Sequence, residues 1–133
     1  MNTISDSITE GIRVTVTPEF VQEENSPDGK KFLFSYRVDI KNEGKLWAKL
    51  MARHWEIINA DGEKQVVDGG GVVGYFPELK PNASFTYTSY CPIDTEWGTM
   101  EGYFEMVREG GNTFIVKIER LYLVSPKLNV EKD

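Results

Sequence analysis

The segment F-L-F-S-Y-R-V-D-I at residues 32–40 decides the fold class of this chain. Large apolar residues alternate there with mostly small or charged ones, so every second side chain falls on one face of an extended backbone. This period-two pattern is typical of a β-strand with one buried and one exposed face. The residues predicted to face the core are Phe32, Phe34, Tyr36, Val38 and Ile40, and N-E-G at 42–44 ends the strand.

Similar extended segments lie on both sides of this strand. Pro18 follows the first of them and predicts an edge or a bulge there, because proline cannot donate a ladder hydrogen bond. Trp55 and Ile57 are expected to face inward, although the phase of their segment is ambiguous between residues 50 and 55. The predicted strands cover 12–17, 46–59, 64–67 and a segment around Phe85 and Tyr87, with turns at 26–29, 61–62 and 81–83 and a loop through 69–71.

Residues 100–108 and 113–123 read as a hairpin across 109–112. No segment has the 3.6-residue apolar period of a packed helix, so helix should be nearly absent. The chain is therefore predicted to be all-β, an immunoglobulin-like or fibronectin type III-like antiparallel sandwich of about seven or eight strands. An antiparallel barrel is the alternative. The domain should span residues 11–125, between flexible tails at 1–10 and 126–133.

Composition restricts the possible partners. The chain has 133 residues, of which 40% are hydrophobic and 27% charged, as expected for one globular domain. Its formal charge of −6 argues against nucleic acid, since that affinity depends on Lys and Arg neutralising phosphates. No apolar stretch approaches a membrane-spanning length of about 20 residues. The lone Cys91 and the absence of a signal-like N-terminus predict a cytoplasmic location.

Gly69, Gly71 and Gly74 match the spacing G-x-G-x-x-G of dinucleotide-binding loops. That loop binds pyrophosphate when it opens a helix, because the helix N-terminus presents free N–H groups to the anion. Here Tyr75, Phe76 and Pro77 follow, without an amphipathic helix. The glycines are therefore predicted to form a connection with positive φ, and an anion-binding loop is the alternative.

The residues most often used in catalysis are few. His54 is the only histidine, so the chain cannot form a His-rich metal site, and a packed, hydrogen-bonded role is expected for it. Cys91 is expected to be a small buried apolar residue. We therefore predict no catalytic residues, no cofactor and no metal.

Aromatic residues near predicted loops are candidate contacts for a protein partner. Phe76, Tyr90 and Trp97 flank the glycine segment and the strand that follows it, so they are expected to share one end of the sandwich. Tyr and Trp are favoured at interfaces. The alternative, which also applies to Trp47, is that these rings close the ends of the core.

The chain resembles the ApaG family, also called CorD, most strongly from Arg53 onward. The resemblance covers about 115 residues. Three residues depart from the family pattern: Asn82 replaces Gly, Ile93 replaces Leu, and Phe104 replaces Tyr. The matching motifs are R-H-W at 53–55, G-x-G-V-V-G at 69–74, P-x-L-x-P at 77–81 and F-x-Y-T-S-x-C-P at 85–92, followed by Thr95, Gly98, Met100, Gly102 and Met106.

This resemblance implies a fibronectin type III-like sandwich and a link to bacterial cobalt tolerance and magnesium efflux. Related domains in some F-box and polymerase-interacting proteins imply a protein-binding module, and no catalytic residues transfer. We therefore expect a non-enzymatic module that binds an unidentified protein. The alternative is a nucleotide or pyrophosphate binder that uses Gly69, Gly71 and Gly74, a segment that has been discussed in the family as a pyrophosphate site. The oligomeric state is left open.

Overall fold

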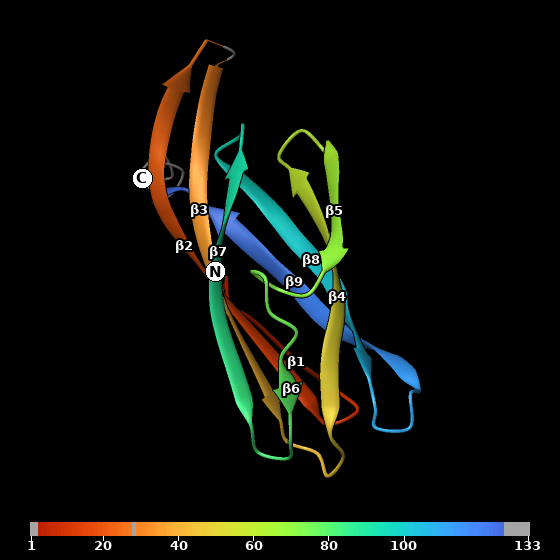
Figure 1. The fold of residues 1–133 in the computed structure, drawn as a ribbon. Helices are drawn as coiled ribbons and strands as arrows, with labels where there is room; N and C mark the ends of the chain where they lie inside the picture. Colours follow the sequence, from red (N-terminus) through yellow and green to blue (C-terminus); the bar gives the residue numbers. More distant parts are fainter. Residues whose placement is uncertain (1–2, 28, 127–133) are drawn as a thin grey trace.

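The computed structural model describes residues 3–27 and 29–126. They form two antiparallel sheets packed face to face (Figure 1). Apart from Pro126, none of the described residues is helical, and none of them belongs to a helix long and apolar enough to span a membrane. The strands are β1 (Ser5–Thr9), β2 (Ile12–Ser26), β3 (Gly29–Asn42), β4 (Ala48–Asn59), β5 (Lys64–Gly70), β6 (Glu78–Leu79), β7 (Ser84–Ile93), β8 (Trp97–Val107) and β9 (Thr113–Val124).

The strand order confirms the predicted sandwich and not the barrel. One sheet has the order β1-β2-β3-β7, and the other has the order β5-β4-β8-β9 with β6 paired to β4. The described residues contain nine strands where seven or eight were expected. The two that the sequence pattern did not reveal are β1 and the two-residue β6.

The core lies between the inner faces of the two sheets. The alternation predicted for residues 32–40 is confirmed, because all five of its predicted inward residues are buried. Trp55 and Ile57 are also buried, as expected. Their ambiguous phase has a physical cause, since the pairing of β4 with β8 shifts register between Leu50 and Ala52. A bulge of this kind interrupts the period-two pattern.

The expected N-terminal tail at residues 1–10 is corrected by β1. This strand pairs with β2 from Ser5↔Val16 to Thr9↔Ile12. It also reaches the other sheet, since Ser7 Oγ donates to the Lys117 carbonyl at 2.9 Å. The residues of β1 are mostly polar and alternate weakly, so the sequence pattern does not indicate a strand. The pairing with β2 and the contact with β9 stabilise it. The expected tail at 126–133 lies outside the described residues, apart from Pro126.

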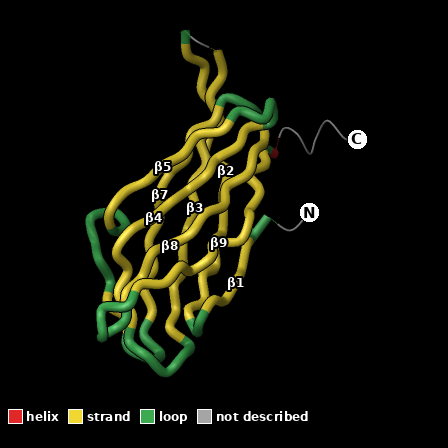
Figure 2. Tube along the Cα trace, turned by 90° about the vertical axis from the view of Figure 1, so that its right-hand side faces the viewer, coloured by secondary structure: helices red, strands yellow, loops and turns green. Residues whose placement is uncertain are grey.

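Pro18 occupies the position that its chemistry requires. β1 pairs with β2 only as far as Val16, so Pro18 lies where β2 has become an edge, and the β2–β3 register shifts between Phe20 and Gln22. Phe32 is the last β3 residue that also pairs with β7, and from Lys31 outward β2 and β3 continue to the turn at Ser26 and Gly29 as a two-stranded arm (Figure 2). The edge and the bulge predicted from Pro18 are both present.

The glycine-rich segment was expected to be a loop after a short strand at 64–67, and this is wrong in part. β5 continues through Gly69 and Gly70, which pair with Arg53 and Ala52 of β4. Backbone pairing needs no side chain, so the glycines do not prevent the ladder from extending. The expected turn at 81–83 accepts Asn82 in place of the family's Gly. Asn82 has φ 73°, a conformation that Asn adopts more readily than most residues.

The two lateral sides of the sandwich differ. On one side β1 and β2 lie against β9, joined by the hydrogen bonds of Ser7 and Thr9 to Lys117. On the other side β7 and β5 are the free edges of the two sheets, and no backbone hydrogen bond joins these two fully described strands. The sandwich is therefore closed on one side and open on the other.

Gly102 tests this packing. A Cβ at this position would overlap the carbonyl oxygen of His54 in the neighbouring strand, whereas Gly110, in the β8–β9 turn, has open space around it. We predict that Gly102→Ala lowers the free energy of unfolding by about 1–3 kcal/mol, as overpacking does. Gly110→Ala should change it by less than ~0.5 kcal/mol. Equal stabilities of the two variants in urea denaturation would contradict the close approach of β4 and β8.

Candidate functional site

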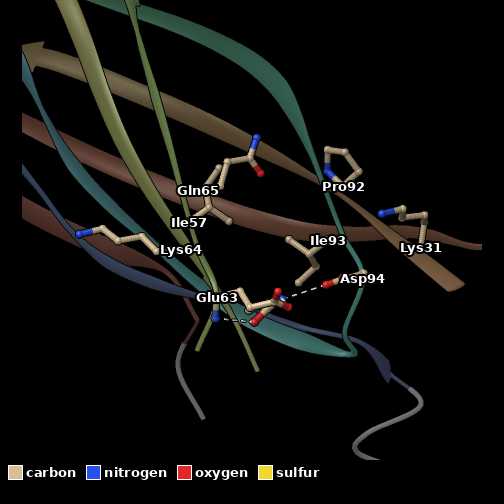
Figure 3. A pocket seen from close by; sticks show the side chains of 9 residues that line it. Lys31, Ile57, Glu63, Lys64, Gln65, Pro92, Ile93 and Asp94 are labelled. Atoms are coloured by element: carbon tan, nitrogen blue, oxygen red, sulfur yellow. Dashed lines mark hydrogen bonds between the residues drawn. The ribbon is translucent and has the colours of Figure 1, made fainter. Parts of the chain in front are cut away.

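Two adjoining cavities follow the open side of the sandwich between β5 and β7. The first has a volume of about 220 Å³ and the second about 190 Å³, and both are lined by Ile57, Gln65 and Pro92. Because they share these three residues, we describe the two cavities together and call them the edge groove. Figure 3 shows the first cavity, where the Asn59 amide donates to Glu63 and to Asp94, each at 2.9 Å. Lys31 and Lys64 line the same cavity from opposite sides.

Arg53 is the principal charged group of the second cavity. Its Nη1 donates to the carbonyl oxygens of Gly70 and Gly71, both at 2.9 Å. Neither acceptor is charged, and no described carboxylate forms an ion pair with the guanidinium. A Cβ on Gly69 would lie 2.8 Å from the guanidinium carbon, so the missing side chain leaves room for Arg53. The glycines thus position a cation.

Mostly apolar and aromatic residues line this cavity together with Arg53. Tyr36 and Trp55 line the cavity with Val67, Cys91 and Met100. Burial raises the pKa of the Tyr36 hydroxyl, and burial raises that of Tyr87 further, while Arg53 opposes both shifts. The Trp55 indole N–H and the Tyr87 hydroxyl are buried without a hydrogen-bond partner among the described residues. Such groups are uncommon in folded proteins.

The G-x-G-x-x-G segment is a strand end followed by a tight turn. Val72 and Tyr75 exchange backbone hydrogen bonds of 2.8 Å in both directions, and Val73 and Gly74 both have positive φ. Positive φ at both central residues defines a type I′ turn, for which glycine is suited. This confirms the expected positive-φ connection at Gly71 and Gly74 but not at Gly69, which lies in β5.

The backbone N–H groups of Gly71, Val72 and Tyr75 are already donating within the protein. An anion-binding nest needs several such groups free and convergent. The alternative role of Gly69, Gly71 and Gly74 in binding pyrophosphate stays a prediction. These three bonds leave fewer backbone N–H groups in the segment free to bind an anion.

His54 lies on the outer face of β4, away from Arg53. Its Nδ1 is 2.6 Å from Asp68 Oδ1 in β5, and its Nε2 is 3.0 Å from Glu56 Oε2. The imidazole stacks on Tyr103 of β8 with ring centroids 4.7 Å apart. The hydrogen bonds to Asp68 and then Glu56 raise the pKa of His54, because both carboxylates favour the imidazolium. The packed, hydrogen-bonded role expected for His54 is confirmed.

The predicted partner-binding aromatics do not share one end. Phe76 lies against Gly70 and Gly71, which pair near Ala52, while Trp97 precedes Gly98, which pairs with Asn59 seven residues farther along β4. At about 3.3 Å per residue the two regions are roughly 23 Å apart. All three side chains are exposed, and Tyr90, at 62%, lines the edge groove.

The thiol of Cys91, which lines the second cavity, is unreactive. Cys91 is buried, and burial raises the pKa of its thiol to about 11, so the thiolate is scarce at neutral pH. This confirms the apolar role expected from the sequence.

No local sequence pattern marks Arg53 as the centre of a cavity. Adjacent strand residues face opposite sides of a sheet. With Trp55 facing inward, the alternation predicts that Arg53 and His54 lie on different faces. The same alternation puts His54 and Glu56, which are two residues apart, on one face, so their contact could be predicted from the sequence. The role of Gly69 could not be inferred, because it depends on a residue in another strand.

The profile of the ApaG domain matches residues 22–108. The chain belongs to the ApaG family. The ApaG protein of Methylobacterium sp. (strain 4-46) is 48% identical over 118 residues, covering 89% of this chain and 91% of that protein. The ApaG protein of Anaeromyxobacter sp. (strain K) is 46% identical over 123 residues, covering 92% and 97%. All of the groove residues lie inside the region that matches the ApaG domain.

Solved structures support the same assignment. The putative ApaA protein from Bordetella pertussis superposes with a TM-score of 0.80 at 39% identity, covering 92% of this chain and 97% of that one. A β-glucuronidase from Bacteroides uniformis superposes with a TM-score of 0.52 at 14% identity, covering 80% of this chain and 12% of the enzyme. The latter likeness concerns the sandwich fold alone. Neither ApaG protein named above carries the name of an enzyme.

The environment of His54 predicts a specific pH dependence. Because its folded-state pKa lies above the ordinary 6.5, its protonation stabilises the fold fully below the unfolded pKa, and this contribution disappears as pH rises through the folded pKa. The stability difference between the wild type and His54→Gln should therefore shrink as pH rises. NMR titration of the single imidazole should give a pKa above 6.5 that falls in Asp68→Asn. A wild-type value at or below 6.5 would contradict the paired geometry.

Proposed function

We infer that the protein is a non-enzymatic protein-binding module that receives an extended, acidic segment of its partner along the edge groove. The observation that carries this proposal is the open side of the sandwich, where β5 and β7 remain unpaired on one side each. An extended peptide can add to such an edge through backbone hydrogen bonds, with side-chain pockets giving specificity. The expected cytoplasmic location is part of this proposal and is supported by the unpaired Cys91.

The edge of β5 is better suited to strand addition than that of β7. Pro92 has no backbone N–H, so β7 lacks one hydrogen-bond donor at that position. Proline on an edge strand discourages pairing with another strand. β5 contains no proline, and its Gln65 and Val67 side chains line the groove. We therefore place the partner segment along β5, facing the rim formed by Tyr90.

Local charge favours an acidic segment even though the whole chain has a net charge of −6. Arg53 and Lys31 line the groove without an ion pair to any described carboxylate, while the Lys64 ammonium is 2.6 Å from Glu56. Glu63 and Asp94 already accept hydrogen bonds from Asn59. Unpaired cations on an otherwise acidic surface would give both orientation and selectivity to an acidic partner.

The proposal is tested with a displayed peptide library selected on the full chain. Enriched peptides should contain a carboxylate and should shift the backbone amide NMR signals of β5. Tyr90→Ala should weaken a selected peptide by about 2 kcal/mol, or roughly 30-fold, because exposed aromatic anchors often dominate such interfaces. The melting temperature should stay nearly constant.

Ile115→Ala is the matched control. Ile115 is 49% exposed on β9 and lines neither cavity of the groove, so its truncation should leave peptide binding unchanged. Equal losses in the two variants, or signal changes confined to β8 and β9, would place the binding surface elsewhere. Failure to select any peptide would count against the whole proposal.

A further inference from the structure

We propose that the cavity around Arg53 is a binding site for a single carboxylate group carried on a small apolar body. This inference does not rest on protein binding, because the cavity could be occupied by a free acid whether or not a partner segment lies along β5. It follows from four features: the charge of Arg53, its uncharged partners, the apolar lining and the size of the cavity.

Arg53 has hydrogen-bonding capacity that the protein does not use. Both of its bonds come from Nη1, so Nη2 and Nε have no acceptor among the described residues. A guanidinium offers a planar fork of donors that matches a carboxylate with two parallel bonds. The same donors are held in place, since Nη1 is anchored to Gly70 and Gly71 and the guanidinium packs over Gly69. The fork is thus preorganised for an external anion.

The net charge of the cavity selects a monoanion. Its lining contains Arg53 and no Lys, Asp, Glu or His. One guanidinium balances one carboxylate, whereas a phosphate dianion or a pyrophosphate would leave uncompensated negative charge among Trp55, Val67 and Met100. Burying unpaired charge is strongly unfavourable. A carboxylate is therefore preferred over the phosphates suggested by the nearby glycine motif.

The remaining lining residues are mostly apolar, with Gln65 and Ser89 as the polar ones, and they favour an apolar body. Side chains of Tyr36, Trp55, Ile57, Val67 and Met100 face a cavity of about 190 Å³. An apolar cavity of about 150 Å³ accommodates a benzene ring. A monocyclic aromatic acid, or an aromatic residue with a neighbouring carboxylate, therefore has a suitable size. The unpartnered indole N–H of Trp55 provides a local reporter for occupancy.

The test is an NMR titration of the full-length wild type with phenylacetate, its neutral isostere phenylacetamide, acetate and inorganic phosphate. We expect phenylacetate to shift the Arg53 Nε–H and Trp55 Nε1–H signals saturably. The amide, acetate and phosphate should each bind at least tenfold more weakly. Equal affinity for the acid and the amide would overturn the proposal without any substitution, and tighter binding of phosphate would do the same.

Substitutions test whether Arg53 is the cation that binds the carboxylate. Arg53→Met should weaken phenylacetate at least tenfold, whereas Arg53→Lys should restore part of that loss. Arg120→Met is the control, because Arg120 is an exposed residue of β9 that pairs with Glu101 at 2.8 Å. Unchanged binding in a folded Arg53→Met variant would refute the assignment. If Arg53→Met does not fold, the comparison of acid and amide on the wild type still decides the question.

A second pair of probes identifies the source of the carboxylate. A pentapeptide ending in phenylalanine is compared with the same peptide amidated at its C-terminus. Preference for the free C-terminus, with additional shifts along β5, would show that the carboxylate belongs to a polypeptide. Binding of phenylacetate alone would show that it belongs to a free acid. Either result supports the carboxylate site, and only the second separates it from the proposed protein-binding function.

Discussion

The contact between Trp55 of β4 and Tyr36 of β3 connects the two sheets at the centre of the sandwich. Their rings meet edge to face with centroids 5.3 Å apart, and Trp55 also packs on Phe104 of β8 at 6.4 Å. Because successive strand residues face opposite sides, the inward position of Trp55 fixes the directions of the two residues before it: His54 faces outward, and Arg53 faces the same side as Trp55. His54 is directed to the outer face, and the Arg53 guanidinium enters the edge groove beside Trp55.

The open side has a topological origin. β1 and β2 contact β9, so one lateral side is sealed by hydrogen bonds as well as by packing. After β5 the chain turns at Val72–Tyr75 and crosses to β7 through β6, which pairs with the opposite end of β4. The free portions of β5 and β7 are therefore left facing each other without a covering strand. Natural sheets usually protect such edges, and here the two edges stay uncovered among the described residues.

Most of the fold could be predicted from the sequence, because period-two burial and turn chemistry are local signals. Such signals predict the alternation from Phe32 to Ile40, the inward position of Trp55, the edge at Pro18 and the turn at Asn82, and the structure has all four. The misses have physical causes. Strand β1 is polar and is stabilised by two neighbours, β5 extends through glycines that pair by backbone alone, and the bulge near Met51 disturbs the alternation. These features depend on contacts between distant segments.

The candidate site was less accessible to sequence reasoning for the same reason. Gly69 drew notice as part of a phosphate-binding pattern, while in the structure it makes room for Arg53 from the adjacent strand. This guanidinium is the proposed receptor group of the open side. A crystal structure of the full chain grown with phenylacetate tests it most directly. We expect density for a carboxylate within hydrogen-bond distance of Arg53 Nη2 or Nε, with the ring against Val67 and Met100. Ligand density bound elsewhere, with Arg53 uncontacted, would contradict it.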